Sequence, residues 1–125
     1  MKIDRIDHLV LTVKNIEATC AFYTSVLGME VETFGEGRKA LKFGNQKLNL
    51  HQKGKEFEPK ADHPTPGAID ICFITIDIID QLKTELENNN IQIQGIFERT
   101  GATGKIRSIY FRDPDQNLIE VSNYL

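Results

Sequence analysis

The stretch Asp113-Pro114-Asp115-Gln116-Asn117-Leu118-Ile119-Glu120-Val121-Ser122-Asn123-Tyr124 joins a tight polar turn to a short strand. Its first residues favour a turn because proline fixes φ, and Asp and Asn side chains bond back to the backbone. In the strand, Ile119 and Val121 point to one face, whereas Leu118, Glu120 and Ser122 point to the other. Glu120 therefore either faces water or is directed into a pocket, and the rest of the chain must decide between these.

The bulk composition is that of an ordinary globular protein with one domain. The chain has 125 residues, of which 40% are hydrophobic and 26% charged, and its formal net charge is -3. The absence of a basic stripe argues against nucleic acid as a partner. No apolar run approaches the roughly 20 residues of a membrane span, and residues 1–6 lack the apolar core of a secretion signal. We therefore expect a cytoplasmic protein with no membrane or nucleic-acid partner.

The two cysteines, Cys20 and Cys72, both fall inside apolar periodic segments. Such cysteines are typically buried free thiols, which agrees with a reducing cytosolic compartment. We therefore predict two buried thiols and no disulfide.

Residues 1–52 carry the signals of a strand, a helix and three further strands. A β-branched, apolar run at 5–13 predicts the first strand. Apolar residues then recur at helical spacing between Asn15, a suitable N-cap, and Gly28, a typical stop signal. Strands are expected at 29–34, 38–43 and 47–51, separated by glycine-containing turns.

The same order returns after a long polar connection at 53–67, which contains three of the four prolines. A strand is predicted at 69–76, followed by a helix that Asp77 can cap and that ends near residues 88–90. Strand-like segments follow at 91–99 and 105–111, and the stretch quoted above closes the chain.

The chain therefore has the pattern βαβββ twice, and a repeat of this kind determines the architecture. We predict an α+β fold in a single domain, 1–125. It consists of module one (1–52), a linker loop (53–67) and module two (68–125), and its two curved mixed sheets form a cleft. The repeat places His8 and Asp70 at equivalent positions in the first strands, and His51 and Glu120 at nearly equivalent positions in the last.

Several motifs resemble the vicinal oxygen chelate superfamily, which includes glyoxalases, bleomycin-resistance proteins and extradiol dioxygenases. They are Asp7-His8, Phe22-Tyr23 with Leu27-Gly28 in the first helix, and the segment from Phe111 to Glu120. A narrower similarity, through segments such as 38–41, 47–51 and 108–115, connects the chain to glyoxalase domain-containing protein five and related bacterial proteins. The resemblance covers the whole chain and implies a glyoxalase-like fold, a small-molecule substrate and a homodimer.

The resemblance also implies a metal site, whose ligand positions fall on His8, His51, Asp70 and Glu120. All four lie on strand faces opposite the clearest apolar stripe. Two imidazoles and two carboxylates suit Fe, Mn, Ni, Co or Zn as a divalent ion, and leave positions for substrate oxygens. Glu120 is in addition the candidate catalytic residue, since a carboxylate that leaves the metal can transfer a proton.

Asp70 is the position that departs from the family pattern, in which a histidine is more usual. Without Asp70, the remaining His8, His51 and Glu120 resemble the two-histidine, one-carboxylate arrangement of non-haem iron enzymes. Taken singly, each of the four residues is more simply a solvated polar side chain. The argument for a site is that all four occupy related places in the repeat.

Tyr110 and Arg107 lie on the strand next to Glu120, and strand parity allows only one of the two to point inward. The sequence alone leaves open which one does so.

The function expected from these features is a metal-dependent lyase or isomerase of the glyoxalase type, acting on a small substrate with neighbouring oxygens. An extradiol Fe(II) dioxygenase is the alternative reaction. A non-catalytic binding protein of the bleomycin-resistance kind is the alternative class.

Overall fold

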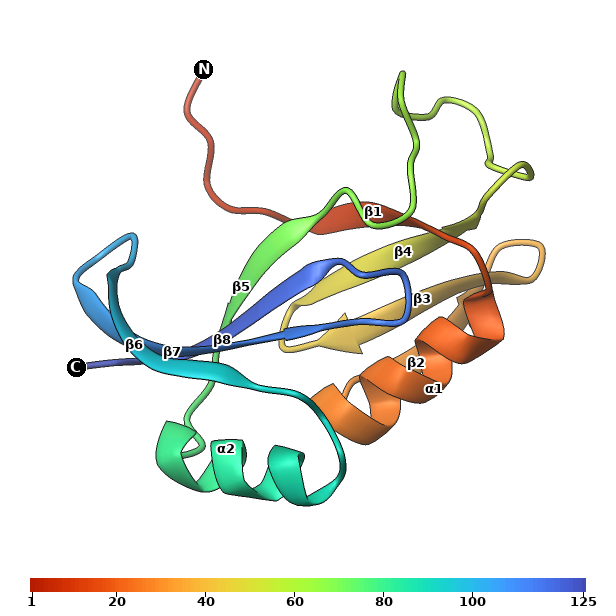
Figure 1. Cartoon of the computed structure of the whole chain (residues 1–125). Helices are drawn as coiled ribbons and strands as arrows, with labels where there is room; N and C mark the ends of the chain where they lie inside the picture. Colours follow the sequence, from red (N-terminus) through yellow and green to blue (C-terminus); the bar gives the residue numbers. More distant parts are fainter. The chain divides into compact units, whose positions relative to one another are not determined.

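The computed structural model describes all 125 residues, and they form two compact units, residues 1–67 and 68–125. Each unit contains a four-stranded sheet and one helix (Figure 1). The βαβββ order predicted for both halves of the chain is thereby confirmed, as is the α+β class. Neither helix has the length and apolar character needed to cross a bilayer.

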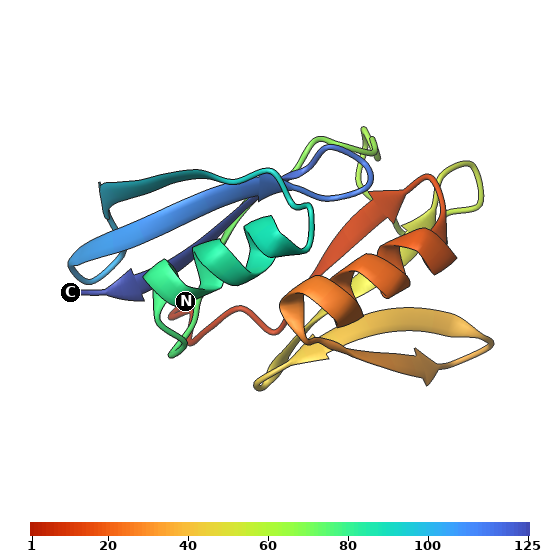
Figure 2. The same ribbon diagram turned by 60° about the horizontal axis from the view of Figure 1, so that its bottom comes forward.

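The first unit consists of β1 (His8–Val13), α1 (Ile16–Leu27), β2 (Glu30–Phe34), β3 (Arg38–Phe43) and β4 (Gln46–Gln52). Its strands lie in the order β1-β4-β3-β2, with β1 parallel to β4 and the other pairs antiparallel. Helix α1 lies across one face of this sheet (Figure 2). The other face carries His8 and His51.

The second unit repeats this arrangement with β5 (Asp70–Ile74), α2 (Ile79–Asn88), β6 (Gln94–Thr100), β7 (Lys105–Arg112) and β8 (Leu118–Tyr124). Its order is β5-β8-β7-β6, again with one parallel pair, β5 with β8. The strand parity predicted for β8 holds, because Ile119 and Val121 are 0% and 5% exposed in the core under α2. Glu120 lies on the opposite face, away from the helix.

Helix α1 begins and ends where the sequence predicts. The Asn15 side chain accepts a hydrogen bond from the backbone N–H of Ala18, 2.9 Å away, which satisfies one of the free donors of the first turn. Gly28 ends the helix with φ at 65°, a conformation that a residue with a side chain rarely adopts.

Helix α2 is capped differently from the prediction. Asp77 makes no side-chain cap, and the N-cap residue is Ile78, which has no capping side chain. Instead Asn123, on β8, accepts from the N–H of Ile79 at 3.0 Å and donates to the carbonyls of Thr75 and Asp77, both at 2.8 Å. The cap therefore comes from a residue more than 40 positions away, which local sequence signals do not reveal.

In the first unit, too, the start of the helix is capped by a side chain that is distant in the sequence. Gln52, near the end of β4, accepts from the N–H of Ile16 at 3.3 Å and donates to the carbonyl of Lys14. In both units the last strand therefore fixes the start of the helix.

The turn before β8 is held by a buried carboxylate. Asp113, 2% exposed, accepts from the backbone N–H groups of Asp115 and Asn117 and from the Asn117 side chain, at 2.8 to 3.0 Å. The Asn117 amide oxygen in turn accepts from the N–H of Ile69, just before β5, at 2.9 Å. The polar turn predicted from the sequence is thus also the link between β8 and β5.

The prediction of two buried thiols is wrong for Cys72, although no disulfide forms. Cys72 is exposed on the face of β5 that also carries Asp70, and it pairs in register with Glu120. Cys20 is half-buried on α1. The prediction failed because β5 has apolar residues on both faces, so composition did not reveal which face Cys72 occupies.

Replacing Asn123 by alanine should lower the free energy of unfolding by about 1–2 kcal/mol, because it removes the cap of α2 and leaves two carbonyls without their donor. Replacing Asp77 by alanine should cost less than about 0.5 kcal/mol, since its side chain caps nothing. Urea unfolding followed by circular dichroism measures both values. Equal losses for the two variants would contradict the long-range cap.

Candidate functional site

The four predicted ligands are divided equally between the two units. His8 and His51 lie on the helix-free face of the first sheet, and Asp70 and Glu120 on the helix-free face of the second. Within either unit, no three His, Cys, Asp or Glu side chains come close enough to hold a metal ion. Each unit therefore contributes two candidate donors.

The His8 ring is oriented by a carboxylate. Its Nδ1 lies 2.8 Å from Asp7 Oδ1, and the hydrogen bond with His8 lowers the pKa of Asp7. An ionised carboxylate only accepts, so Nδ1 donates in this hydrogen bond and Nε2 is the ring nitrogen left for a ligand. A histidine held in this way by a carboxylate is typical of metal ligands.

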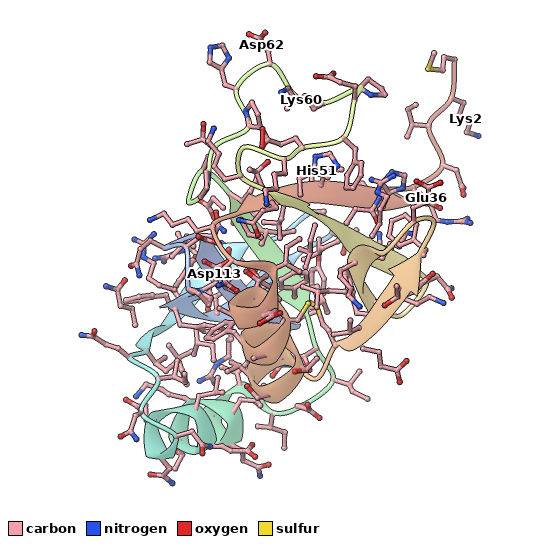
Figure 3. All side chains as sticks on the ribbon, turned by 90° about the vertical axis from the view of Figure 1, so that its right-hand side faces the viewer. Lys2, Glu36, His51, Lys60, Asp62 and Asp113 are labelled. Carbon is pink, nitrogen blue, oxygen red and sulfur yellow. The ribbon has the colours of Figure 1, made fainter.

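His51 has a different environment. The ring is 3% exposed and makes an edge contact with Phe57, 5.6 Å between ring centroids. It lies below the loop that carries Lys60 and Asp62 (Figure 3). Its Nε2 is 3.4 Å from Nη2 of Arg38, and because arginine only donates, Nε2 must accept. Burial and the nearby guanidinium both lower the pKa of His51, so the ring is neutral but its Nε2 lone pair is already engaged.

Strand register also separates the two histidines. On the parallel neighbours β1 and β4, His8 pairs with Lys47 while His51 pairs with Thr12. This offset of four residues corresponds to roughly 13 Å along the strands. His8 and His51 share a face, but they do not adjoin.

Asn49 lies between these positions on the same face of β4, and no signal in the sequence points to it. It pairs with Val10, is 6% exposed, and its amide oxygen has no hydrogen-bond partner. A buried oxygen without a donor is costly unless a ligand or ion satisfies it. Asn49 is therefore a candidate oxygen donor closer to His8 than His51 is.

In the second unit the two candidate carboxylates are close together. Asp70 pairs with Leu118 and Glu120 pairs with Cys72 on the parallel neighbours β5 and β8. An offset of two residues across one strand spacing places their Cα atoms about 8 Å apart. Asp70 is exposed and Glu120 half-buried. Both carboxylates lie on one face and are accessible to a cation.

A pocket of about 360 Å³ opens on the Glu120 face of the second unit. Its lining includes Cys72, Arg99, Tyr110, Glu120 and Tyr124. The alternative left open by strand parity is thereby resolved, because Tyr110 lines the pocket whereas Arg107 pairs with Asp80 of α2, at 3.1 Å.

The hydroxyl of Tyr110 connects the two charged residues of this pocket. It accepts from Arg99 Nε at 3.1 Å, and Tyr110 pairs in register with Glu120. Burial raises the pKa of Tyr110, and Glu120 raises it further, while the bond from Arg99 acts in the opposite direction. A protonated phenol beside Glu120 can donate a hydrogen bond to that carboxylate or to a bound substrate oxygen.

Glu120 is also connected to three small side chains, of which Ser108 and Ser122 are buried. Ser122 Oγ lies 3.4 Å from Glu120 Oε1, 3.4 Å from Cys72 Sγ and 2.7 Å from Ser108 Oγ. Burial raises the pKa of the Cys72 thiol, which therefore stays neutral at pH 7. These contacts restrict the orientation of Glu120.

Each unit by itself offers donors whose chemistry suits a divalent cation. Asp70 and Glu120 form no salt bridge, His8 Nε2 makes no hydrogen bond, and the unpartnered oxygen of Asn49 adds a further donor. Mixed nitrogen and oxygen ligation is typical of Zn, Fe, Ni, Co and Mn sites. The guanidinium beside His51 disfavours a cation at that predicted position.

Comparison with known proteins gives a consistent family. A family model described as the Glyoxalase/Bleomycin resistance protein/Dioxygenase superfamily matches residues 5–121. The chain is 59% identical to virulence protein STM3117 of Salmonella typhimurium, covering 100% of this chain and 88% of that protein. The crystal structure of STM3117 matches the whole of both chains with a TM-score of 0.98.

Two further similar proteins support the same family. Glyoxalase domain-containing protein RDO1 of Mycosarcoma maydis is 54% identical, with 99% of this chain and 70% of that protein covered. The crystal structure of lactoylglutathione lyase from Agrobacterium tumefaciens is 27% identical and has a TM-score of 0.75, covering 98% of this chain and 95% of the other. The resemblance noted in the sequence is thereby confirmed.

Replacing Arg38 by methionine should raise the pKa of His51 toward its usual value, because a cation that opposes protonation of the ring is removed. Part of the depression should remain, since burial by Phe57 and its neighbours is unchanged. NMR titration of the His51 ring signals measures the pKa. The matched variant Arg107→Met, which removes a cation elsewhere, should leave it unchanged; an equal effect in both variants would contradict the contact.

Proposed function

The chain belongs to the Glyoxalase/Bleomycin resistance protein/Dioxygenase superfamily, and on this premise we propose that it is a metal-dependent enzyme of the glyoxalase-like group. The proposed reaction is a lyase or isomerase step on a small substrate with two neighbouring oxygens. The observation that carries the proposal is the carboxylate-oriented His8, whose Nε2 is free, together with the accessible Asp70 and Glu120. Likeness to a lactoylglutathione lyase supports the reaction class.

The proposed ligands are His8 and His51 of the first unit and Asp70 and Glu120 of the second unit. His51 is the weakest member because its Nε2 already accepts from Arg38. Asn49 is the substitute that the structure offers on the same strand. A bound divalent ion supplies Lewis-acid polarisation of the two substrate oxygens.

The remaining chemistry belongs to residues of the second unit. Glu120 is the proposed proton acceptor, because a half-buried carboxylate next to a protonated phenol can take up and return a proton. Tyr110 orients that carboxylate and offers its hydroxyl to a substrate oxygen. The side chains of Ile74 and Ile106 give the pocket an apolar wall.

Because the His51 lone pair is already engaged, a second function is also a candidate. In this function the protein binds a small molecule in the same place without metal chemistry. With His51 paired to Arg38, the first unit offers only one imidazole to a cation. A bleomycin-resistance-like binding protein needs no metal ligands at all. Ligand binding that is indifferent to metal would favour this second candidate.

Metal binding by purified, chelator-treated protein tests the proposal. Titration calorimetry with Zn²⁺, Mn²⁺ and Ni²⁺, checked by elemental analysis, should give stoichiometric binding to the wild-type protein. His8→Ala and Glu120→Ala should each weaken it on the order of 100-fold, and Asp7→Asn about 10-fold through loss of ring orientation. His63→Ala should have no effect, because this exposed histidine lies outside the proposed set.

Two further variants distinguish the fourth donor. If His51 is a ligand, His51→Ala should weaken metal binding more than Asn49→Ala, and the reverse order would assign this place to Asn49. Wild-type protein that binds no metal, or a His8→Ala variant that binds as well as wild type, would refute the metal-dependent function.

A further inference from the structure

The pocket beside Glu120 contains one cation and one anion among its lining residues, Arg99 and Glu120. The rest of the lining is apolar or neutral, and includes Ile74, Ile106 and Tyr124. Glu120 belongs to the proposed metal site, whereas Arg99 has no role in that site.

Arg99 is held in place without being neutralised. Its guanidinium carbon lies 4.7 Å from the ring centre of Phe97 and 5.7 Å from that of Tyr110. Nε donates to Tyr110 Oη and Nη1 to the carbonyl of Glu98, both at 3.1 Å. These bonds use two of the five N–H groups of the guanidinium. No carboxylate forms an ion pair with Arg99, so its charge is free to bind an anion.

The loop between β6 and β7 gives this end of the pocket a defined wall. The N–H of Gly101 donates to the carbonyl of Gly104 at 2.7 Å, and the N–H of Thr103 donates to Tyr124 Oη at 3.2 Å. A Cβ atom on Gly101 would lie 2.9 Å from Tyr124 Oη, so loop and ring are in close contact. Arg99 stands at the base of this loop, on a strand that is therefore fixed relative to β8.

The two charges lie on either side of one hydroxyl group. Arg99 contacts Tyr110 Oη, and Glu120 is the register partner of Tyr110. A ligand in the pocket therefore meets a positive end and a negative end with apolar walls between them. A dianion such as phosphate would be repelled by Glu120, whereas the single charge of a carboxylate placed at Arg99 is tolerated.

We propose that Arg99 is a specificity-determining residue that selects a small organic monoanion, binding its carboxylate at one end of the pocket while two neighbouring oxygens point toward Glu120. The part of this inference that concerns the neighbouring oxygens rests on the proposed function. The part that concerns Arg99 does not depend on a metal. The substrate class is thus an organic acid with an apolar body and a vicinal pair of oxygens.

A matched pair of probes tests the proposal on the full chain. The probes are 3,4-dihydroxybenzoate and 3,4-dihydroxybenzyl alcohol, which share the vicinal oxygens and differ in the carboxylate. NMR shift titrations with metal-free and with Zn²⁺-loaded protein give Kd for each. We expect the carboxylate probe to bind about tenfold more tightly, the usual scale of one charge-assisted hydrogen-bonded contact.

Two arginine variants locate the effect. Arg99→Gln should abolish the preference for the carboxylate, so that the two probes bind with equal affinity. Arg107→Gln removes the same charge from the opposite face of the sheet, where Arg107 pairs with Asp80, and should leave the preference intact. Circular dichroism spectra confirm that both variants are folded.

The outcomes separate this inference from the proposed function. Equal affinities for the two probes, equal effects of the two variants, or no binding of either probe up to ~10 mM would overturn the role of Arg99. In another outcome the protein binds no metal and still shows a preference for the carboxylate probe that depends on Arg99, with and without added Zn²⁺. This result would support the role of Arg99 and refute the metal-dependent enzyme. A protein that binds metal but shows no preference for the carboxylate probe would support the metal-dependent function and refute the role of Arg99.

Discussion

The buried carboxylate of Asp113 is the constraint on which the second unit depends. It accepts from two backbone N–H groups and from the amide of Asn117, whose oxygen holds the N–H of Ile69. This sets the register of β5 against β8 and so places Asp70 and Glu120 two residues apart on one face. In the first unit, Gln46 links the start of β4 to the residues before β1, because its side chain donates to the carbonyl of Ile6 at 2.9 Å. A turn residue thus determines the geometry of the candidate ligands.

Local signals in the sequence were sufficient for most of the fold. The repeat, the bounds of α1 and the alternation in β8 follow from periodicity, Asn15 and Gly28, all of which act within a few residues of their targets. The start of α2 was not predictable in this way, because Asn123 reaches it through the fold rather than along the chain. Cys72 was misplaced for a related reason, since a strand with apolar residues on both faces does not reveal which face is covered.

The candidate site shows the same division between local and long-range information. His8, Asp70 and Glu120 are candidates through the family resemblance and their places in the repeat, and the contact of Asp7 with His8 is between neighbours in sequence. Arg38 beside His51, and Arg99 beside Tyr110, depend on strand register, which the sequence did not determine. Asn49 carries no signal in the sequence, because only the fold shows that its oxygen is buried and unpartnered.

The capping of each helix by the last strand of its own unit has a consequence for synthesis on the ribosome. As the chain emerges, the α2 segment appears well before Asn123, so the start of the helix lacks its partner until β8 has followed. The start of α2 therefore gains its cap only after β8 has emerged, late in the appearance of the unit. The first unit closes in the same way through Gln52, and it can do so while the second is still being made.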